Sequence, residues 1–419
     1  MKEIKPQKLR DAEVIVPGSK SYTHRILIAA GLSDGICTIK NPLKSEDTLL
    51  TMEALKRFGI NIDEENNGFF VHGKKGRLAP PKETIFLGNS GTSMRLLTAV
   101  ASLGDGLYTL TGTERMQERP IQDLLDGLKQ IGVFARSVRE NGCPPVVIPG
   151  GNLKGGPVKL NCKISSQFLS ALLLIAPYAR EGLDITVVEG PVSRPYVDMT
   201  VAVMEKLGVS VLREGYKKFT VRGSQTYRAG SYTVEPDCSQ AGYFWAAAAI
   251  TGNSVKVKGI LSDSRQGDIR FVDLLQKMGC RISRESDGIK ITGGPLRSVE
   301  ADMADMPDLV PTLSMVAAFA KGTTVITNVA HLKAKESDRL TAVANELSKM
   351  GIDAVCTGSG LQIHGGRPHG AAIETYGDHR IAMSFAIAGL VVPGVVIKDE
   401  QVVGKSFPTF WDVFEKLYG

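Results

Sequence analysis

The sequence of 419 residues has no CxxC pair, few aromatic residues and no long apolar run. No apolar segment is long enough to span a bilayer, and the polar start lacks the apolar core of a signal peptide. The wide spacing of the cysteines predicts neither a zinc site nor a disulfide framework. These absences favour a cytoplasmic enzyme without a metal ion. The six cysteines are Cys37, Cys143, Cys162, Cys238, Cys280 and Cys356.

The positive charges of the chain are scattered and do not form runs. Lysine and arginine number 50 against 44 aspartates and glutamates, which gives a net charge of +6. No basic run is interleaved with aromatic residues, so small anionic substrates fit at least as well as nucleic acid. The length allows two domains with substantial cores.

The chain does contain a long internal repeat. A helix pattern, then a glycine, then a strand pattern occurs six times. Each marker glycine lies where a helix C-cap is expected. A second, amphipathic helix such as "VMEKLGVSV" follows in phase, and two β segments come after it. The marker glycines are Gly35, Gly106, Gly182, Gly252, Gly322 and Gly394.

The sixth repeat lacks its closing strands. The N-terminal segments "KEIKPQKL" and "AEVIVPG" can supply them, so the two ends of the chain are expected to meet. Six repeats could form an open solenoid or two closed lobes of three. Division after the third repeat predicts one lobe over residues 17–234 and a discontinuous lobe made of residues 1–16 and 235–419.

Polar residues gather at six junctions where a strand runs into an apolar helix. A helix start carries unpaired N–H groups and a positive dipole end, so each junction can bind an anion. If the helices of each lobe run parallel, their starts share one face, and two such faces would make a polarised cleft. The first three junctions carry Lys20, Ser21, Arg25, Asn89, Thr92, Arg95, Ser165, Ser166 and Gln167. The last three carry Asp237, Asp308, Asp378, His379 and Arg380.

This asymmetry predicts an enzyme that binds phosphate and moves protons. In "KAKESDRL", Lys335 and Arg339 are like charges four residues apart, which is unfavourable unless an anion or carboxylate joins them. Neither "GSKS" nor "GKS" has the glycine spacing of a Walker A loop. No GxSxG or HExxH motif is present, so hydrolase and zinc-protease chemistry are not indicated.

Eight motifs in this order resemble the 5-enolpyruvylshikimate-3-phosphate (EPSP) synthase family over essentially the whole chain: "PGSKSxxxR", "LGNSGTxMR", "RMQERP", "SSQF", "SRPY", "KESDR", "DHRIAM" and "GKSFP". The resemblance implies a two-lobed inside-out α/β barrel with six βαβαββ units, three per lobe. It implies transfer of the enolpyruvyl group of phosphoenolpyruvate to the 5-hydroxyl of shikimate 3-phosphate, with no cofactor. It also implies competition by glyphosate, a slightly longer analogue of phosphoenolpyruvate.

The resemblance also implies roles for individual residues. Asp308 would take the hydroxyl proton, Glu336 would protonate the methylene carbon, Lys20 would lie between the substrates, and His379 would help to orient them. Shikimate 3-phosphate would contact Lys20, Ser21, Arg25, Ser165, Ser166, Gln167, Ser193, Tyr196, Asp308 and Lys335. Phosphoenolpyruvate would contact Lys20, Asn89, Gly91, Arg119, Gln167, Arg339, Arg380 and Lys405. Gly91 would let the backbone approach the phosphate, and Thr92 would cap or brace the turn.

The chain departs from the common family pattern in its second junction. Many members have alanine at the positions of Ser90 and Ser93, and proline at the position of Leu96. Many also have asparagine where His331 stands.

Two alternatives to this function remain. The related UDP-N-acetylglucosamine enolpyruvyl transferase typically has a reactive cysteine in the loop that corresponds to residues 112–120, where this chain has none. A non-catalytic six-repeat protein that binds a phosphorylated ligand would not need Asp308 and Glu336 together. The expected protein is a monomer that acts on small molecules, without nucleic acid or membrane partners.

Overall fold

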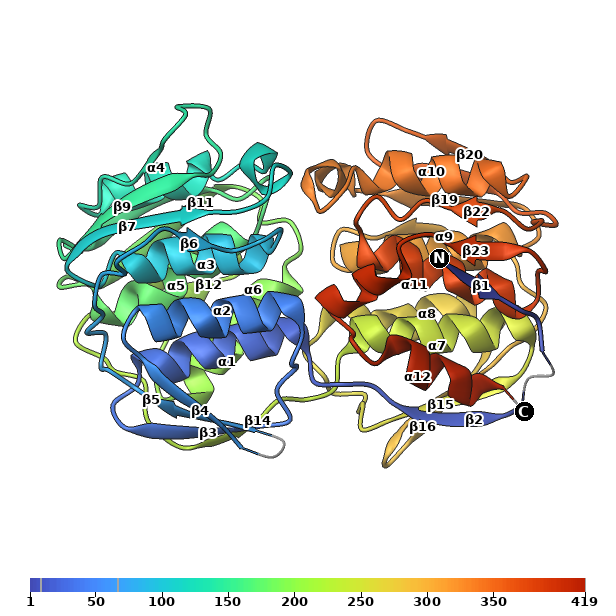
Figure 1. The fold of residues 1–419 in the computed structure, drawn as a ribbon, viewed down its shortest axis with the longest axis horizontal. Coiled ribbons are helices and arrows are strands. Elements are labelled where there is room, and N and C mark those ends of the chain that lie inside the picture. Colours follow the sequence, from blue (N-terminus) through green and yellow to red (C-terminus); the bar gives the residue numbers. More distant parts are fainter. Residues whose placement is uncertain (8–9, 66–67, 419) are drawn as a thin grey trace. The chain divides into compact units, whose positions relative to one another are not determined.

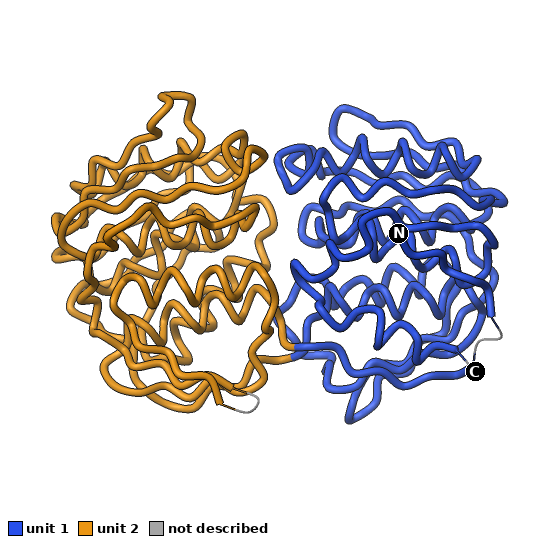
Figure 2. The backbone as a smooth tube through the Cα atoms, in the orientation of Figure 1, with its two compact units in different colours: residues 1–17, 236–419 blue, residues 18–235 orange. Residues whose placement is uncertain are grey.

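The computed structural model describes residues 1–7, 10–65 and 68–418, and its elements alternate between helices and short strands (Figure 1). The chain divides into two compact units (Figure 2). Unit 1 comprises Met1–Pro17 and Pro236–Gly419, and unit 2 comprises Gly18–Glu235. The predicted α/β class is confirmed.

Unit 2 contains three four-stranded sheets. The first sheet consists of β3 (Ile36–Lys40), β4 (Asn61–Glu65), β5 (Gly68–His72) and β14 (Ser231–Thr233). The second consists of β6 (Ile85–Phe86), β7 (Gly106–Thr111), β8 (Arg136–Ser137) and β9 (Val146–Gly150). The third consists of β10 (Gly156–Asn161), β11 (Leu183–Glu189), β12 (Leu212–Glu214) and β13 (Lys218–Val221). The helices are α1 (Lys20–Leu32), α2 (Glu46–Arg57), α3 (Gly91–Ala101), α4 (Gln122–Gln130), α5 (Gln167–Ile175) and α6 (Pro195–Lys206).

Unit 1 repeats this design with two four-stranded sheets and one three-stranded sheet. The first consists of β2 (Ala12–Ile15), β15 (Ser254–Lys258), β16 (Arg281–Glu285) and β17 (Gly288–Thr292). The second consists of β18 (Glu300–Asp302), β19 (Thr323–Thr327), β20 (Asp353–Cys356) and β21 (Leu361–His364). The third consists of β1 (Lys2–Ile4), β22 (Ala372–Ile373) and β23 (Val395–Ile397). The helices are α7 (Cys238–Thr251), α8 (Phe271–Lys277), α9 (Val310–Ala318), α10 (Arg339–Lys349), α11 (His379–Ala386) and α12 (Phe410–Phe414).

The helices of each unit form its interior, with sheets on the outside. In unit 2, α1, α2 and α3 lie between β3–β5 on one side and β7 and β9 on the other (Figure 1). Every residue of α9 is buried, as are residues 168–175 of α5, which confirms that these all-apolar helices lie inside. In the part of the chain that the structure describes, the strands form six separate sheets and do not close into a barrel.

The first strand of most repeats pairs in parallel with the second strand of the same repeat, as β6 does with β7. The first strands of the first and fourth repeats are exchanged between the sheets of those two repeats. β14, which leads into α7, pairs in parallel with β3, whereas β2, which leads into α1, pairs in parallel with β15. The expectation that both N-terminal segments complete the sixth repeat is therefore half right. β1 pairs with β23 of that repeat, but β2 completes the sheet of the fourth.

The marker glycines all adopt the left-handed backbone conformation, but only Gly252 is a helix C-cap. The other five follow their helices by several residues, where the chain turns into the next strand. The expectation that every marker glycine is a C-cap is wrong at those five. The turn after the helix, and not the helix end, requires the positive φ.

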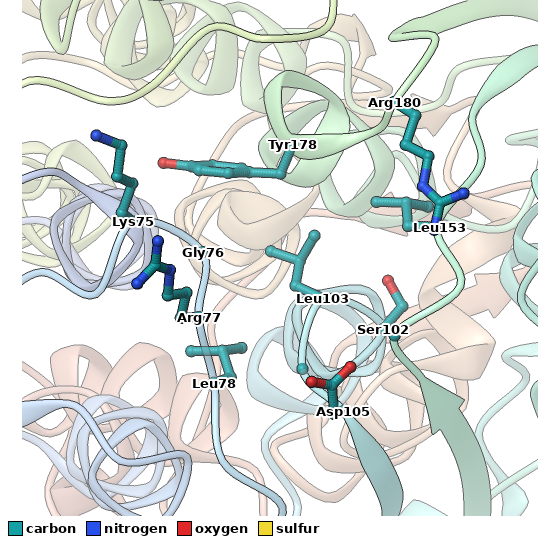
Figure 3. A pocket seen from close by; sticks show the side chains of 12 residues that line it. Lys75, Gly76, Arg77, Leu78, Ser102, Leu103, Asp105, Leu153, Tyr178 and Arg180 are labelled. Atoms are coloured by element: carbon teal, nitrogen blue, oxygen red, sulfur yellow. The ribbon is translucent and has the colours of Figure 1, made fainter.

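A pocket of about 370 Å³ opens where α3 ends, around Ser102, Leu103 and Asp105. Figure 3 shows Lys75 and Arg77 on one side of it, and Tyr178 and Arg180 on another. None of the predicted site residues lines this pocket, and its charged side chains belong to exposed residues. Among the described residues, no helix combines the length and apolar character needed to cross a bilayer.

Candidate active site

The six polar junctions are helix starts, as predicted. Ser90 caps α3 and Asp237 caps α7, each accepting a hydrogen bond from a backbone N–H of the first turn. Asp378 caps α11 in the same way, and a 3-10 turn that contains Asp308 precedes α9. Side-chain oxygens at these positions stabilise the helix starts and leave other N–H groups available to a ligand.

Gly91 makes room for an arginine. The guanidinium of Arg119, which is 3% exposed, donates from Nη1 to the carbonyl of Asn89 at 2.9 Å and to its side-chain oxygen at 3.1 Å. A Cβ at Gly91 would lie 2.8 Å from Cζ of Arg119, which is too close without movement. The turn thus brings Asn89, Gly91 and Arg119 together, as predicted for one end of phosphoenolpyruvate.

Gln167 joins the second and third junctions. Its Nε2 donates to the hydroxyl of Thr92 at 2.9 Å, and its Oε1 accepts from Nη1 of Arg95 at 2.8 Å. Thr92 therefore braces the start of α5, and the suggestion that it caps α3 is wrong, because Ser90 is the cap. Ser165 also contacts Arg95, at 3.4 Å.

Arg25 is a buried cation among neutral groups. Its guanidinium donates to Thr200 Oγ1 at 2.7 Å, Ser170 Oγ at 3.3 Å and the carbonyls of Ser21 at 2.9 Å and Tyr196 at 3.1 Å. Burial lowers the pKa of Arg25 to about 10. A buried charge among neutral partners is unfavourable, so an anionic ligand near this side chain would gain binding energy.

Lys20, in the first turn of α1, forms an ion pair that the sequence did not suggest. Its Nζ lies 3.0 Å from Oδ2 of Asp47, which is 2% exposed. Asp47 lies in the first turn of α2, where an acidic residue commonly complements the helix dipole. That ordinary position explains why nothing in the sequence singled it out.

In unit 1, one guanidinium holds three carboxylates. Arg339 is 1% exposed and donates to Asp378 at 2.7 Å, Glu336 at 2.8 Å and Asp308 at 2.9 Å. Burial acts to lower the pKa of Arg339, but the carboxylates of Asp378, Glu336 and Asp308 outweigh it and raise the pKa above its usual value. Ser337 donates to the same Asp378 oxygen, Oδ2, at 3.1 Å.

Asp308 joins three cations. Its Oδ2 accepts from Arg380 at 2.7 Å, and its Oδ1 lies 2.9 Å from Arg339 and 3.7 Å from Lys335. Of the two groups that could join Lys335 and Arg339, an anion or a carboxylate, the structure shows a carboxylate, that of Asp308. Arg380 also donates to the hydroxyl of Tyr243 at 3.3 Å, and burial raises the pKa of this tyrosine to about 12.

The remaining predicted residues lie on the same helix starts or next to them. His379 is fully buried, with Nδ1 3.8 Å from Oδ1 of Asp378. Ser193 is buried with a positive φ just before α6, and the carbonyl of Tyr196 accepts from Arg25. Lys405 ends a 3-10 turn and is 4% exposed. His379 adjoins the Arg339 cluster through Asp378.

Asp268 is a buried carboxyl group that sequence reasoning missed. It lies in a 3-10 turn before α8, is 4% exposed and accepts a hydrogen bond from Ser239 at the start of α7. Burial, with a contribution from the charge of Asp308, raises the pKa of Asp268 to about 7. The polar stretch "SRQGDIR" resembles a solvated loop, so no pattern marked this residue.

Replacing Asp268 with asparagine is expected to change the pH dependence of stability. Because the folded-state pKa is raised, the native protein holds a proton that the unfolded chain releases, and stability falls as pH rises from about 4 to about 7. An asparagine side chain cannot ionise, so the stability of D268N relative to the native protein should rise over that window, by up to about 1.4 kcal/mol per pH unit. Thermal unfolding across this range measures the difference.

Asp353→Asn is the control, because that aspartate side chain is 70% exposed. D353N should therefore change the pH dependence of stability little. Parallel profiles for D268N and the native protein would show that Asp268 is ionised normally.

Known proteins resemble this chain over almost its whole length. Residues 4–414 match the family model described as EPSP synthase (3-phosphoshikimate 1-carboxyvinyltransferase). The 3-phosphoshikimate 1-carboxyvinyltransferase of Syntrophobacter fumaroxidans is 44% identical over 99% of both chains, and that of Methanosphaerula palustris is 46% identical over 96% of both. The solved structure of EPSP synthase from Acinetobacter baumannii superposes with a TM-score of 0.83 at 30% identity, covering 99% of this chain and 97% of that one.

Proposed function

The chain belongs to the EPSP synthase family, and we propose that the residues described above divide the work of this enzyme into substrate binding and proton transfer. The enzyme transfers the enolpyruvyl group of phosphoenolpyruvate to the 5-hydroxyl of shikimate 3-phosphate and releases phosphate. It thereby acts in the shikimate pathway of aromatic amino acid biosynthesis. The fold is the two-lobed α/β fold of this family.

The observation that carries the proposal is the Arg339 cluster. One guanidinium contacts both Asp308 and Glu336, so a proton acceptor and a proton donor are held by the same cation. Addition of an alcohol to an enol phosphate needs both: a base at the hydroxyl and an acid at the alkene carbon. Fixing both groups to a single planar guanidinium keeps their separation constant through the reaction.

The proposed chemistry has two steps. Asp308 takes the proton of the 5-hydroxyl as its oxygen bonds to C2 of phosphoenolpyruvate, and Glu336 gives a proton to the methylene carbon, which forms a tetrahedral intermediate. In the second step the Glu336 carboxylate takes a proton back from the methyl carbon, the double bond re-forms, and phosphate leaves with the proton held by Asp308. His379 helps to orient the methylene end, and Lys20 neutralises charge between the two substrates.

The binding roles follow the charges of the substrates. Two phosphates and two carboxylates require several cations, and Arg forks suit both groups. For shikimate 3-phosphate we assign Lys20, Ser21, Arg25, Ser165, Ser166, Gln167, Ser193, Tyr196, Asp308 and Lys335. For phosphoenolpyruvate we assign Lys20, Asn89, Gly91, Arg119, Gln167, Arg339, Arg380 and Lys405. Support for the first set comes from Arg25, whose buried charge has neutral partners, and for the second from the Gly91–Arg119 contact.

We further propose that the enzyme acts as a monomer in the cytoplasm, on small molecules alone. All the assigned contacts come from one chain, so no second copy is needed to complete the set. Both substrates are phosphorylated anions, which cells retain in the cytoplasm because a charged phosphate does not cross a lipid bilayer unaided.

The test is a phosphate-release assay with both substrates. We expect release only when shikimate 3-phosphate and phosphoenolpyruvate are present together, with 5-enolpyruvylshikimate 3-phosphate as the second product. UDP-N-acetylglucosamine should not replace shikimate 3-phosphate. Release with that nucleotide sugar, or tight binding without turnover, would favour the alternatives considered from the sequence.

Replacing Gly91 with alanine tests the proposed phosphoenolpyruvate site. The added methyl group would press on the guanidinium of Arg119, which must shift away from its two bonds with Asn89. We expect KM for phosphoenolpyruvate to rise several-fold and the glyphosate inhibition constant to rise by roughly tenfold more, because overpacking penalises the longer molecule. Steady-state kinetics with glyphosate as the competing inhibitor gives both constants.

Gly358→Ala is the matched control, because nothing lies within 4 Å of an added Cβ there. It should leave both constants unchanged. If G91A raises KM and the inhibition constant by the same factor, Gly91 does not border the phosphate end of these ligands.

A further inference from the structure

A buried chain of hydroxyl groups links three helices in unit 2. His24 of α1, Thr51 of α2, and Ser93 and Ser90 at the start of α3 are all completely buried. Nδ1 of His24 lies 2.8 Å from Oγ1 of Thr51, which lies 2.8 Å from Oγ of Ser93. Ser93 Oγ lies 2.7 Å from Oγ of Ser90. None of these residues has a role in the chemistry proposed above.

Counting hydroxyl protons shows which group donates and which accepts at each hydrogen bond of this network. Ser93 has one hydroxyl proton, and the carbonyl oxygen of Asp47, 3.2 Å away, can only accept. Once Ser93 donates to Asp47, the hydroxyls of Thr51 and Ser90 must both donate to Ser93. Thr51 then accepts from Nδ1–H of His24, which selects one tautomer of that ring. Ser93 is therefore the common acceptor of the network, and its hydroxyl links the network to Asp47.

The network adjoins two residues assigned to phosphoenolpyruvate, one reached from Ser93 through Asp47 and one next to Ser90. The side chain of Asp47 holds the ammonium of Lys20 at 3.0 Å. At the other end, Ser90 caps α3 and immediately precedes Gly91, whose turn contacts Arg119. A shift of Ser93 would thus displace both Lys20 and the turn that contains Gly91.

We propose that Ser93 is a positioning residue for phosphoenolpyruvate: its hydroxyl fixes Asp47 and Ser90, and through them places Lys20 and the Gly91 turn. This inference rests on the function proposed for Lys20 and Gly91. An alanine at position 93 could neither accept from Thr51 nor donate to Asp47. In this protein, hydrogen bonds between hydroxyl groups, rather than packing alone, connect Asp47 to Ser90.

The first test compares Ser93→Ala with Ser102→Ala. Both serines are fully buried at opposite ends of the same helical segment, and the hydroxyl of Ser102 donates locally, to the carbonyl of Ala99 at 2.6 Å. Removing the shared acceptor leaves buried donors without a partner. We expect S93A to raise KM for phosphoenolpyruvate roughly five- to tenfold, with the Kd of shikimate 3-phosphate changed less than about twofold. S102A should leave both constants near native values, even where it lowers the melting temperature equally.

A second pair of variants keeps the proposal testable if S93A folds poorly. Thr51→Val preserves the shape but removes the hydroxyl, whereas Thr51→Ser preserves the hydroxyl. T51V should therefore raise KM for phosphoenolpyruvate as S93A does, and T51S should stay close to the native value. A purely structural role would make both variants alike in KM, because each changes the packing and neither contacts a substrate.

Lys20→Met separates this inference from the function on which it rests. A normal KM for phosphoenolpyruvate in K20M would overturn the role proposed for Lys20. A raised KM in K20M, together with a normal KM in S93A and T51V, would leave the role of Lys20 standing and overturn that of Ser93.

Discussion

Glu336→Gln is expected to lower kcat by roughly 10²-fold or more while the Kd of shikimate 3-phosphate stays nearly unchanged. Glutamine has the shape of glutamate but cannot deliver the proton that the methylene carbon needs. Its side-chain oxygen can still accept from Nη2 of Arg339, whose bonds with Asp378 and Asp308 remain. Single-turnover kinetics with both substrates measures the loss directly.

Glu346→Gln is the matched control for this experiment. Glu346 is a fully buried glutamate on α10, and it accepts from Lys349 at 2.8 Å, Tyr376 at 2.7 Å and the backbone N–H of Glu374 at 3.0 Å. E346Q should lower stability by about 1–3 kcal/mol with near-normal kcat. The opposite pattern, with E336Q active and E346Q inactive, would remove Glu336 from the proposed acid role.

The repeat made much of the fold predictable from the sequence. A period of about 70 residues fixes the order of elements, and polar residues mark the six junctions between a strand and an apolar helix. The exchange of β2 and β14 could not be predicted in the same way. Each has the short alternating pattern of a first strand, and the partner depends on where the chain passes from one unit to the other.

The sequence singled out the charged residues of the candidate site but not the residues that hold those side chains in place. The like charges of Lys335 and Arg339 indicated an anion or a carboxylate near both, and Asp308 lies near both. Asp47 and Thr51 lie on α2, whose amphipathic pattern is that of any surface helix. Asp268 lies in a short polar turn. Only tertiary packing reveals that these residues support the predicted ones, because their partners are far away in the sequence.

Arg339→Met is expected to lower the stability of unit 1 strongly. It removes the cation from three carboxylates, of which Asp378 is fully buried and Glu336 nearly so. Breaking such a buried cluster costs about 3–5 kcal/mol, because Asp378 and Glu336 lose a charged partner, whereas Asp308 keeps Arg380 and Lys335. Turnover should fall more than in E336Q, since the base, the acid and a proposed phosphoenolpyruvate contact are disturbed together. Chemical denaturation and steady-state kinetics measure the two effects.

The pH dependence of the stability of R339M distinguishes loss of the charge of Arg339 from simple loss of packing around its side chain. The raised pKa of Arg339 keeps the native side chain charged throughout the working range, so its contribution is the same at about pH 5 and about pH 8. In R339M the buried carboxylates lose one shared cation, which favours uptake of a proton in the folded state, so stability should rise as pH falls from about 8 to about 5. Arg339→Lys keeps a charge but loses the planar fork, so it should regain part of the stability and little of the turnover. A pH-independent deficit in R339M would mean that methionine fails to fill the space of the guanidinium, and that the charge of Arg339 is not what holds the carboxylates together.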